Sequence, residues 1–145
     1  KFAASGSNDG SMRLWEVSTG KNRTVTGNDG IPHAVCYKHD NKFVITGGNT
    51  GLIEIWNVAT AERFQTLEGH RGPVKSLAIS QDDLLLISGG HDATVRVWDL
   101  QSRKLLGIAE GHKNNVYGVA ISTDGKHAAS ASFDRTIKVW AILTG

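Results

Sequence analysis

The chain has little of what marks several common protein classes. Cysteine occurs once, at Cys36, which excludes an internal disulfide framework and a cysteine-rich zinc site. Proline occurs only at Pro32 and Pro73, and each precedes a predicted strand, where a missing N–H costs little. No apolar run approaches the roughly 20 residues that span a bilayer, and no signal peptide opens the sequence. We therefore expect an intracellular protein, cytoplasmic or nuclear, with no contact to a membrane.

Charge of one sign is also nearly absent. Sixteen Lys and Arg against fourteen Asp and Glu leave a net charge of +2, too small to predict a nucleic-acid groove. The 39% of hydrophobic and 21% of charged residues are typical of a globular protein. With 145 residues, we expect residues 1–145 to form one structural unit.

What the chain does contain is a repeat marked by tryptophan. The tryptophans stand at positions 15, 56, 98 and 140, so they are 41, 42 and 42 residues apart. Each ends a similar tetrapeptide, MRLW, IEIW, VRVW or IKVW. One and three residues before each Trp the side chain is apolar, and two before it is charged. This alternation predicts a strand with one buried face.

Further positions recur in step with the tryptophans. Ten residues before each Trp is a hydroxyl side chain, at Ser5, Thr46, Ser88 and Ser130. Six residues before each is an aspartate or its replacement, at Asp9, Thr50, Asp92 and Asp134. A Gly-His pair precedes the last two tryptophans by the same distance, at His70 and His112. So many shared offsets identify a repeat protein.

Each period contains four strand-like segments. In the third period these are 74–80, 84–88, 94–100 and 105–109, separated by residues that favour tight turns. No segment has a convincing 3.6-residue period. The sequence therefore predicts an all-β protein of four-stranded units, each about 42 residues long.

Gly69-His70 followed by Trp98-Asp99, and Gly111-His112 followed by Trp140, resemble the WD-repeat β-propeller family. The resemblance implies four-stranded antiparallel blades arranged around a channel, each repeat supplying the outer strand of one blade and the inner three of the next. Three tryptophans depart from the pattern because Glu16, Asn57 and Ala141 follow them. In the second repeat, Asn28 and Thr50 take the places of the His and the Asp. The repeat units end near Trp15, Trp56, Trp98 and Trp140.

The number of strands is about half of what a closed ring needs. The repeat arithmetic gives 14 strands, whereas a ring of about seven four-stranded blades has about 28. We expect the chain to be a segment of a longer protein, the rest of which supplies the missing blades. Self-association, or completion of the ring by another subunit, are the alternatives.

A constellation of His70, Ser88 and Asp92 has the composition of a catalytic Ser-His-Asp triad. The resemblance implies instead a structural network inside each blade, in which Trp donates to the hydroxyl, the hydroxyl meets the imidazole, and the imidazole meets the carboxylate. Since the set recurs 42 residues later, we expect no catalytic residue. The predicted network comprises His70, Ser88, Asp92 and Trp98, then His112, Ser130, Asp134 and Trp140, and in part Ser5, Asp9 and Trp15.

The remaining histidines and aromatics point to binding rather than catalysis. His33, His39, His91 and His127 lack the spacing of metal ligands, so we expect no metal and no cofactor. By the family's geometry, Tyr117 and Phe133 fall on one rim of the propeller. Exposed aromatics beside polar and basic groups suit a partner-binding patch, and packing of Tyr117 against the channel is the alternative. The predicted rim patch comprises Asn8, His33, Asn49, Lys75, His91, Tyr117 and Phe133.

These observations favour a non-catalytic scaffold that binds peptides or domains of other proteins and assembles a multisubunit complex. The alternative is a propeller subunit of a chromatin or RNA complex that contacts nucleic acid or histones. The scattered Arg23, Lys75, Lys113 and Arg135 give that alternative little support. A propeller-based enzyme is the least favoured class.

Overall fold

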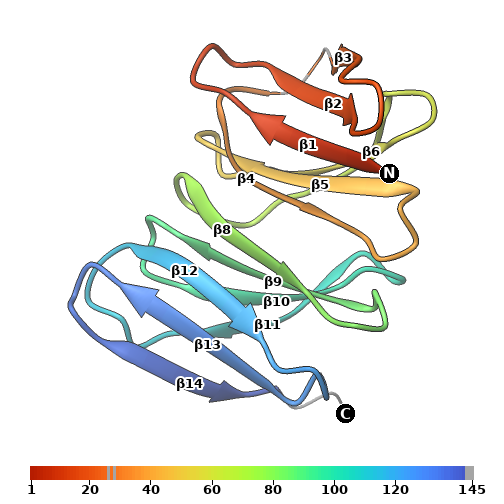
Figure 1. Cartoon of the computed structure of the whole chain (residues 1–145). Helices are drawn as coiled ribbons and strands as arrows, with labels where there is room; N and C mark the ends of the chain where they lie inside the picture. Colours follow the sequence, from red (N-terminus) through yellow and green to blue (C-terminus); the bar gives the residue numbers. More distant parts are fainter. Residues whose placement is uncertain (26, 28, 143–145) are drawn as a thin grey trace.

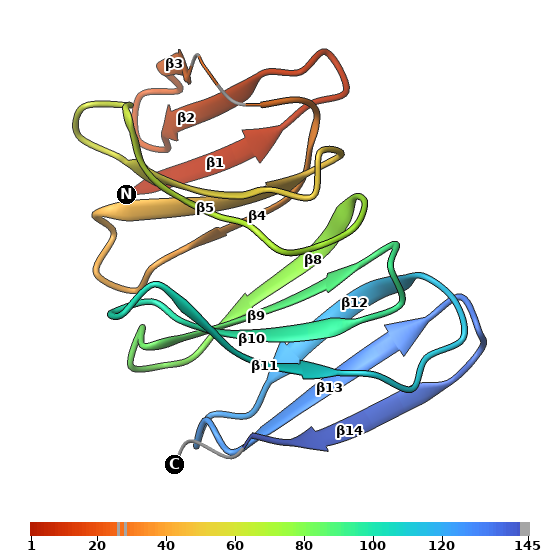
Figure 2. The same cartoon turned by 180° about the vertical axis from the view of Figure 1, so that it is seen from behind.

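The structure is a computed structural model that describes residues 1–25, 27 and 29–142. Within these ranges the chain contains strands and turns but no helix, and it forms fourteen strands, the number that the repeat predicts (Figures 1 and 2). The strands are β1 (Phe2–Gly6), β2 (Met12–Glu16), β3 (Asn22–Val25), β4 (Pro32–Tyr37), β5 (Phe43–Gly48), β6 (Ile53–Asn57), β7 (Arg63–Leu67), β8 (Val74–Ile79), β9 (Leu85–Gly90), β10 (Val95–Asp99), β11 (Lys104–Ala109), β12 (Val116–Ile121), β13 (His127–Ser132) and β14 (Ile137–Ala141).

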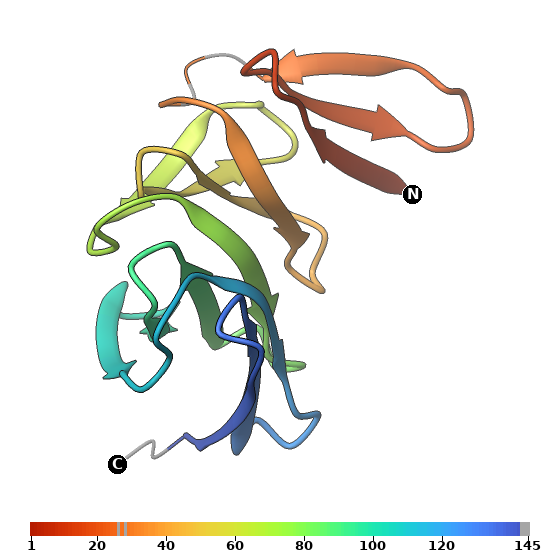
Figure 3. The ribbon, with the colours of Figure 1, turned by 90° about the vertical axis from the view of Figure 1, so that its left-hand side faces the viewer.

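The strands form four antiparallel sheets that follow one another in chain order (Figure 3). We call them blade 1 (β1–β3), blade 2 (β4–β7), blade 3 (β8–β11) and blade 4 (β12–β14). Within each sheet every strand pairs with its neighbour in sequence. The all-β architecture of antiparallel blades predicted from the sequence is confirmed, with four strands in blades 2 and 3 and three in blades 1 and 4.

The apolar residues of these strands are buried between blades rather than within them. In β2, Met12 and Leu14 are buried while Arg13 between them is exposed, as the alternating pattern predicts. In β6 the residues from Ile53 to Trp56 are all buried, because blade 2 lies between two other blades. A sheet in the middle of the row therefore buries both faces.

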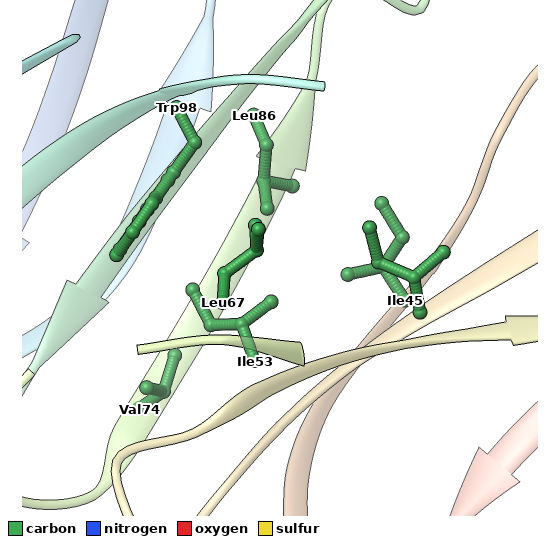
Figure 4. Packing of buried hydrophobic residues seen from close by; sticks show 7 residues of the cluster. Ile45, Ile53, Leu67, Val74, Leu86 and Trp98 are labelled. Atoms are coloured by element: carbon green, nitrogen blue, oxygen red, sulfur yellow. The ribbon is translucent and has the colours of Figure 1, made fainter. Parts of the chain in front are cut away.

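Three hydrophobic clusters occupy the three gaps between blades. Between blades 2 and 3, Ile53 and Leu67 of one blade meet Val74, Leu86 and Trp98 of the next (Figure 4). The other two clusters are Met12, Leu14, Val25, Val44, Trp56 and Val58 between blades 1 and 2, and Ile87, Val95, Val116 and Ala128 between blades 3 and 4. Each of these clusters draws residues from two blades, so the blades stabilise one another.

Glycine in the second strand of a blade lets the first strand of the next blade approach. A Cβ added to Gly89 would lie 2.6 Å from Cγ1 of Val116, and one added to Gly47 would lie 2.6 Å from Cγ1 of Val74. Val74 and Val116 are fully buried, so neither can move aside without opening the core. The close spacing of neighbouring blades thus requires glycine, which has no side chain, at these two positions.

We expect Gly89→Ala to lower the free energy of unfolding by about 1–3 kcal/mol, since the new methyl group overpacks a filled gap. Urea unfolding followed by tryptophan fluorescence measures this. Gly107→Ala in β11 is the matched control, because a Cβ there meets nothing within 4 Å. The double variant Gly89→Ala/Val116→Ala should show coupling between the two sites. Equal midpoints for Gly89→Ala and the unmodified chain would contradict the close approach.

Candidate functional site

Blade 3 contains a continuous chain of hydrogen bonds between polar side chains. The indole Nε1 of Trp98 donates to Ser88 Oγ over 2.8 Å, and Ser88 Oγ lies 2.7 Å from His70 Nε2. On the other side of the ring, His70 Nδ1 lies 2.9 Å from Asp92 Oδ2. Because the ionised Asp92 carboxylate can only accept, the imidazole of His70 donates to it from Nδ1, and its Nε2 is then free to accept from the Ser88 O–H.

The protonation states in blade 3 follow from burial and hydrogen bonding. Burial lowers the pKa of His70 below its usual 6.5, although Asp92 opposes the shift. Burial alone would raise the pKa of Asp92, but hydrogen bonds from the Arg71 amide, Thr94 and His70 outweigh it and lower this pKa to about 2. A neutral imidazole beside an ionised carboxylate is therefore the stable state at neutral pH.

Blade 4 repeats the arrangement. Trp140 Nε1 donates to Ser130 Oγ over 2.8 Å, and Ser130 Oγ lies 2.7 Å from His112 Nε2. His112 Nδ1 lies 2.8 Å from Asp134 Oδ2. Hydrogen bonds from Thr136, from a backbone amide and from His112 hold the pKa of Asp134 well below its usual value.

Blade 1 keeps the tryptophan–hydroxyl bond. Trp15 Nε1 donates to Ser5 Oγ over 2.9 Å, and Asp9 is bonded within its own turn, as Asp92 and Asp134 are to Thr94 and Thr136. Asp9 accepts from the amide of Ser11 at 2.8 Å and from the Ser11 hydroxyl at 2.7 Å. Among the residues that the structure describes, Asp9 forms no hydrogen bond to Ser5 or Trp15, so the structure does not join these three side chains into one network.

Blade 2 replaces the His–Asp pair with an ion-pair cluster that the sequence reasoning missed. Trp56 Nε1 still donates to Thr46 over 2.9 Å. Arg63 Nη1 lies 2.7 Å from the buried Glu54 and 2.5 Å from Asp29, which belongs to the loop before β4. The expected replacement of His by Asn28 lies outside the described residues.

A signal for the ion-pair cluster of blade 2 was present in the sequence. Two residues before the tryptophan, the other repeats have the cations Arg13, Arg96 and Lys138, whereas the second has Glu54. In blade 3 the cation Arg96 lies 3.4 Å from Asp92. Where the aspartate is replaced by threonine, the cation is replaced by a carboxylate, and Arg63 of the outer strand pairs with that carboxylate.

The Ser-His-Asp set of blade 3 is not arranged for nucleophilic attack. Ser88 is 0% exposed, and its oxygen is shared between an indole N–H and an imidazole. A substrate carbonyl has no access to that oxygen. The geometry fits a packing role, because each buried polar atom of the set has a partner.

Three residues of the predicted rim patch lie at the starts of first strands, and the other four lie in the turns that follow β1, β5, β9 and β13. The pairing of β4, β8 and β12 with their neighbours shifts by one residue near its start, and the extra residues are His33, Lys75 and Tyr117. A bulge re-aims the side chain of its extra residue. Three neighbouring blades thus present one extra residue each at the same end of the sheet.

Aromatic contacts link these positions to the turns of blades 3 and 4. The ring of His91 lies 5.9 Å from that of Tyr117 in an edge-on arrangement, and Tyr117 lies 6.1 Å from Phe133. Tyr117 is 49% exposed and Phe133 68%. Partial burial, together with the nearby Lys75 and His91, lowers the pKa of His33.

The two asparagines of the predicted rim patch have different surroundings. Asn49 Oδ1 accepts from the backbone N–H of Ile31 at 2.8 Å, and the backbone N–H of Asn49 donates to the Ile31 carbonyl at 3.0 Å. Asn49 thus fixes the entry to blade 2. Asn8 is exposed in the turn between β1 and β2.

The described part of the chain has neither a metal-binding cluster nor a membrane-spanning helix. No group of three or more His, Cys, Asp or Glu side chains in it is placed to hold a metal ion. No helix in it is long and apolar enough to cross a membrane.

Comparison with known proteins gives one family match and several partial matches to individual proteins. Residues 20–57, 61–99 and 103–141 match the family described as WD domain, G-beta repeat. WD repeat-containing protein 70 of Xenopus laevis is 36% identical over 73 residues, which are 44% of this chain and 12% of that protein. Nuclear distribution protein nudF of Aspergillus niger is 36% identical over 67 residues, or 46% of this chain and 15% of that protein.

A third relative is named for guanine nucleotide exchange. Guanine nucleotide-exchange factor SEC12 of Mus musculus is 31% identical over 52 residues, or 36% of this chain and 12% of that protein. In all three cases the matched segment is a small fraction of the relative's length. The similarity therefore concerns the repeat and not the whole relative.

We expect Asp92→Ala to lower the free energy of unfolding by about 3–5 kcal/mol, because it leaves a buried histidine without its partner. Asp9→Ala changes the same repeat position where no histidine is bonded, and should cost only about 1 kcal/mol for the lost turn hydrogen bond. Urea titrations of both variants measure the difference. Similar losses in the two variants would refute the role of the His70–Asp92 contact.

Acid should weaken the fold in two steps. The folded pKa of His70 lies below 6.5 and that of Asp92 at about 2 rather than 3.8, so the unfolded chain binds more protons in both windows. Stability should therefore fall as the pH drops below 6.5, and again between 3.8 and about 2. Urea unfolding at a series of pH values tests this, with Asp92→Asn expected to make the second step smaller and Asp134 to retain its own contribution. A stability that rises with acid would exclude both contributions.

Proposed function

The chain belongs to the WD-repeat family, and we propose that it is a non-catalytic platform whose rim binds peptides or domains of other proteins. Proteins of this family generally act in protein–protein interactions. On this proposal the chain helps to assemble a multisubunit complex. We further propose that blades from a longer chain complete the ring, which the small fraction of each relative covered by its match supports.

The observation that carries the proposal is the aromatic cluster of His91, Tyr117 and Phe133. Phe133 is 68% exposed and Tyr117 49%, although both are large apolar rings. Exposed aromatic rings in contact with one another are typical of binding hot spots, where they supply most of the affinity. Lys75 and His33 on the neighbouring bulges add polar and cationic groups around them.

The buried networks hold the loops that carry these rings. Asp92 accepts from the amide of Arg71, and Asp134 from that of Lys113, each at 2.9 Å. The amide of His91 donates to Pro73, and that of Phe133 donates to Asn115, also over 2.9 Å. A rim fixed before binding loses little conformational entropy when a partner arrives, which favours affinity.

One atom of the rim has no partner of its own. Nε2 of His91 is buried and forms no hydrogen bond in the part of the chain that the structure describes. A buried polar atom without a partner is unfavourable by about 1–3 kcal/mol.

We also propose that the protein works inside the cell, in the cytoplasm or the nucleus. Cys36 is a free thiol, and burial, with a smaller contribution from Asp83, raises its pKa to about 12. A single unreactive cysteine without a disulfide suits a reducing compartment.

We expect Tyr117→Ala and Phe133→Ala each to weaken binding to a protein partner by about tenfold, as for a hot-spot residue. Partners are identified by affinity purification with mass spectrometry, and their dissociation constants are then measured by calorimetry. Leu84→Ala, at a turn distant from the rim, is the matched control because Leu84 is similarly exposed, at 48%.

Unchanged affinity in both rim variants would argue against this rim as the binding surface. Salt dependence separates the alternative class of function. Affinity for DNA or RNA that falls steeply with salt would support a nucleoprotein subunit instead, since that dependence comes from the release of counterions.

A further inference from the structure

The outer strand of blade 1 lacks a bulge that the outer strands of blades 2 and 3 share. Where β6 pairs with β7, Ile55 is opposite Gln65 and Trp56 is opposite Arg63, so Phe64 is an extra residue. Leu106 is the extra residue in β11. The pairing of β2 with β3 has no such shift.

This difference explains why the first two tryptophans are one residue closer together than the others. The turns before the outer strands have the same length, because Glu16 bonds to Lys21 and Asn57 bonds to Glu62, each five residues on. The missing residue therefore lies in the strand itself, at the place of Phe64.

Phe64 and a neighbouring arginine cover the outer end of the gap between blades 2 and 3. The ring of Phe64 lies 5.0 Å from that of Phe43. The guanidinium of Arg103, from the last turn of blade 3, lies 5.0 Å from the Phe64 ring. In blade 2 the residue five positions after the tryptophan is Ala61 rather than an arginine. The gap between blades 1 and 2 thus lacks both members of this pair.

A cavity of about 740 Å³ occupies that gap. Phe2, Leu14 and Val58 supply its apolar wall, and the guanidinium of Arg23 crosses it to donate to the carbonyls of Val58 and Ala59. Its volume is in the range of sites that bind small molecules or short peptide segments, about 300–1,000 Å³. We call it the basic interblade pocket.

The charge of the basic interblade pocket is one-sided. Lys21, Arg23 and Lys42 line it, against the single carboxylate of Glu16. That carboxylate already accepts a hydrogen bond of 2.6 Å from Thr19. The pocket therefore presents unbalanced positive charge beside an apolar wall.

The corresponding gap between blades 3 and 4 has the opposite character. A cavity of about 560 Å³ there is lined by Asp82, Asp99 and Asp124, with Lys126 as the single cation. The same position in the fold therefore differs in charge between these two gaps. The cavity between blades 1 and 2 is basic, and the cavity between blades 3 and 4 is acidic.

The basic interblade pocket lies away from the rim. Phe2 is the first residue of β1, and the rim turn follows the last residue of the same strand, so the two sites lie at opposite ends of it (Figure 1). Lys42 precedes β5, whereas Asn49 of the rim follows it. A ligand in the pocket would leave the rim free.

We propose that the basic interblade pocket binds an acidic peptide segment of a partner protein. A bulky apolar side chain of the peptide takes the place that Phe64 has in the next gap. Carboxylates on either side of it pair with Lys21 and Lys42. Binding here is independent of the rim and so adds a second docking surface to the platform.

A fluorescein-labelled peptide with a central phenylalanine flanked by glutamates is the probe, and its binding is followed by fluorescence anisotropy. Replacing the glutamates by lysines, or the phenylalanine by serine, should each lower the affinity by about tenfold. The double variant Lys21→Glu/Lys42→Glu should have a similar effect. Lys126→Glu, the same change at the repeat position of Lys42, should leave the affinity within about twofold.

A one-residue insertion tests the place of the apolar side chain. A phenylalanine inserted between Asn22 and Arg23 restores the 42-residue spacing and should fill the pocket, lowering the affinity by about tenfold. An alanine inserted at the same point restores the spacing without filling the pocket and should change the affinity less. Thermal melting of every variant shows that it is folded.

The proposal is overturned if the unmodified protein does not bind the probe at millimolar concentration, or if the charge-reversal pair and Lys126→Glu behave alike. Its failure is distinguishable from failure of the rim. Tyr117→Ala should weaken rim binding and leave the affinity for the acidic probe unchanged.

Discussion

The packing of one blade against the next is the constraint on which the rest of the structure depends. The first strand of each following blade lies against a glycine of the blade before it, as Val74 does at Gly47 and Val116 at Gly89. The apolar clusters then form across the gaps from residues of both blades. Stability in such an array is a sum over neighbouring interfaces, so each gap can vary while the neighbouring gaps are preserved.

The buried polar residues follow from the same constraint. The hydroxyl, imidazole and carboxylate groups that are buried inside a blade have little access to solvent, so each needs a partner within its blade. Blades 3 and 4 meet this need with His70–Asp92 and His112–Asp134, and blade 2 meets it with Glu54 and Arg63. Two different sets of polar groups thus serve the blades, and in each set the groups bond to one another.

Much of the fold and part of the candidate site could be read from local patterns. The two-residue alternation before each tryptophan placed β2, β6, β10 and β14, and the ten-residue offset paired Trp98 with Ser88 across adjacent strands. The same offsets did not show that Asp9, Asp92 and Asp134 also bond within their own turns, since these bonds depend on the local backbone geometry of the turn. The Arg63 cluster was missed because its members come from separate strands and a loop.

The sequence by itself determined the strands, the repeat and the pairing of neighbours within a blade, because these depend on side-chain alternation and turns that are local in the chain. Only the tertiary structure decided where the blades meet. The one-residue shorter spacing after Trp15 is visible in the sequence, but its meaning requires the register of β2 with β3 and of β6 with β7. The cavity lined by Lys21 and Lys42 exists because two blades face each other there. Contacts between residues far apart in the chain are set by packing, which no local pattern specifies.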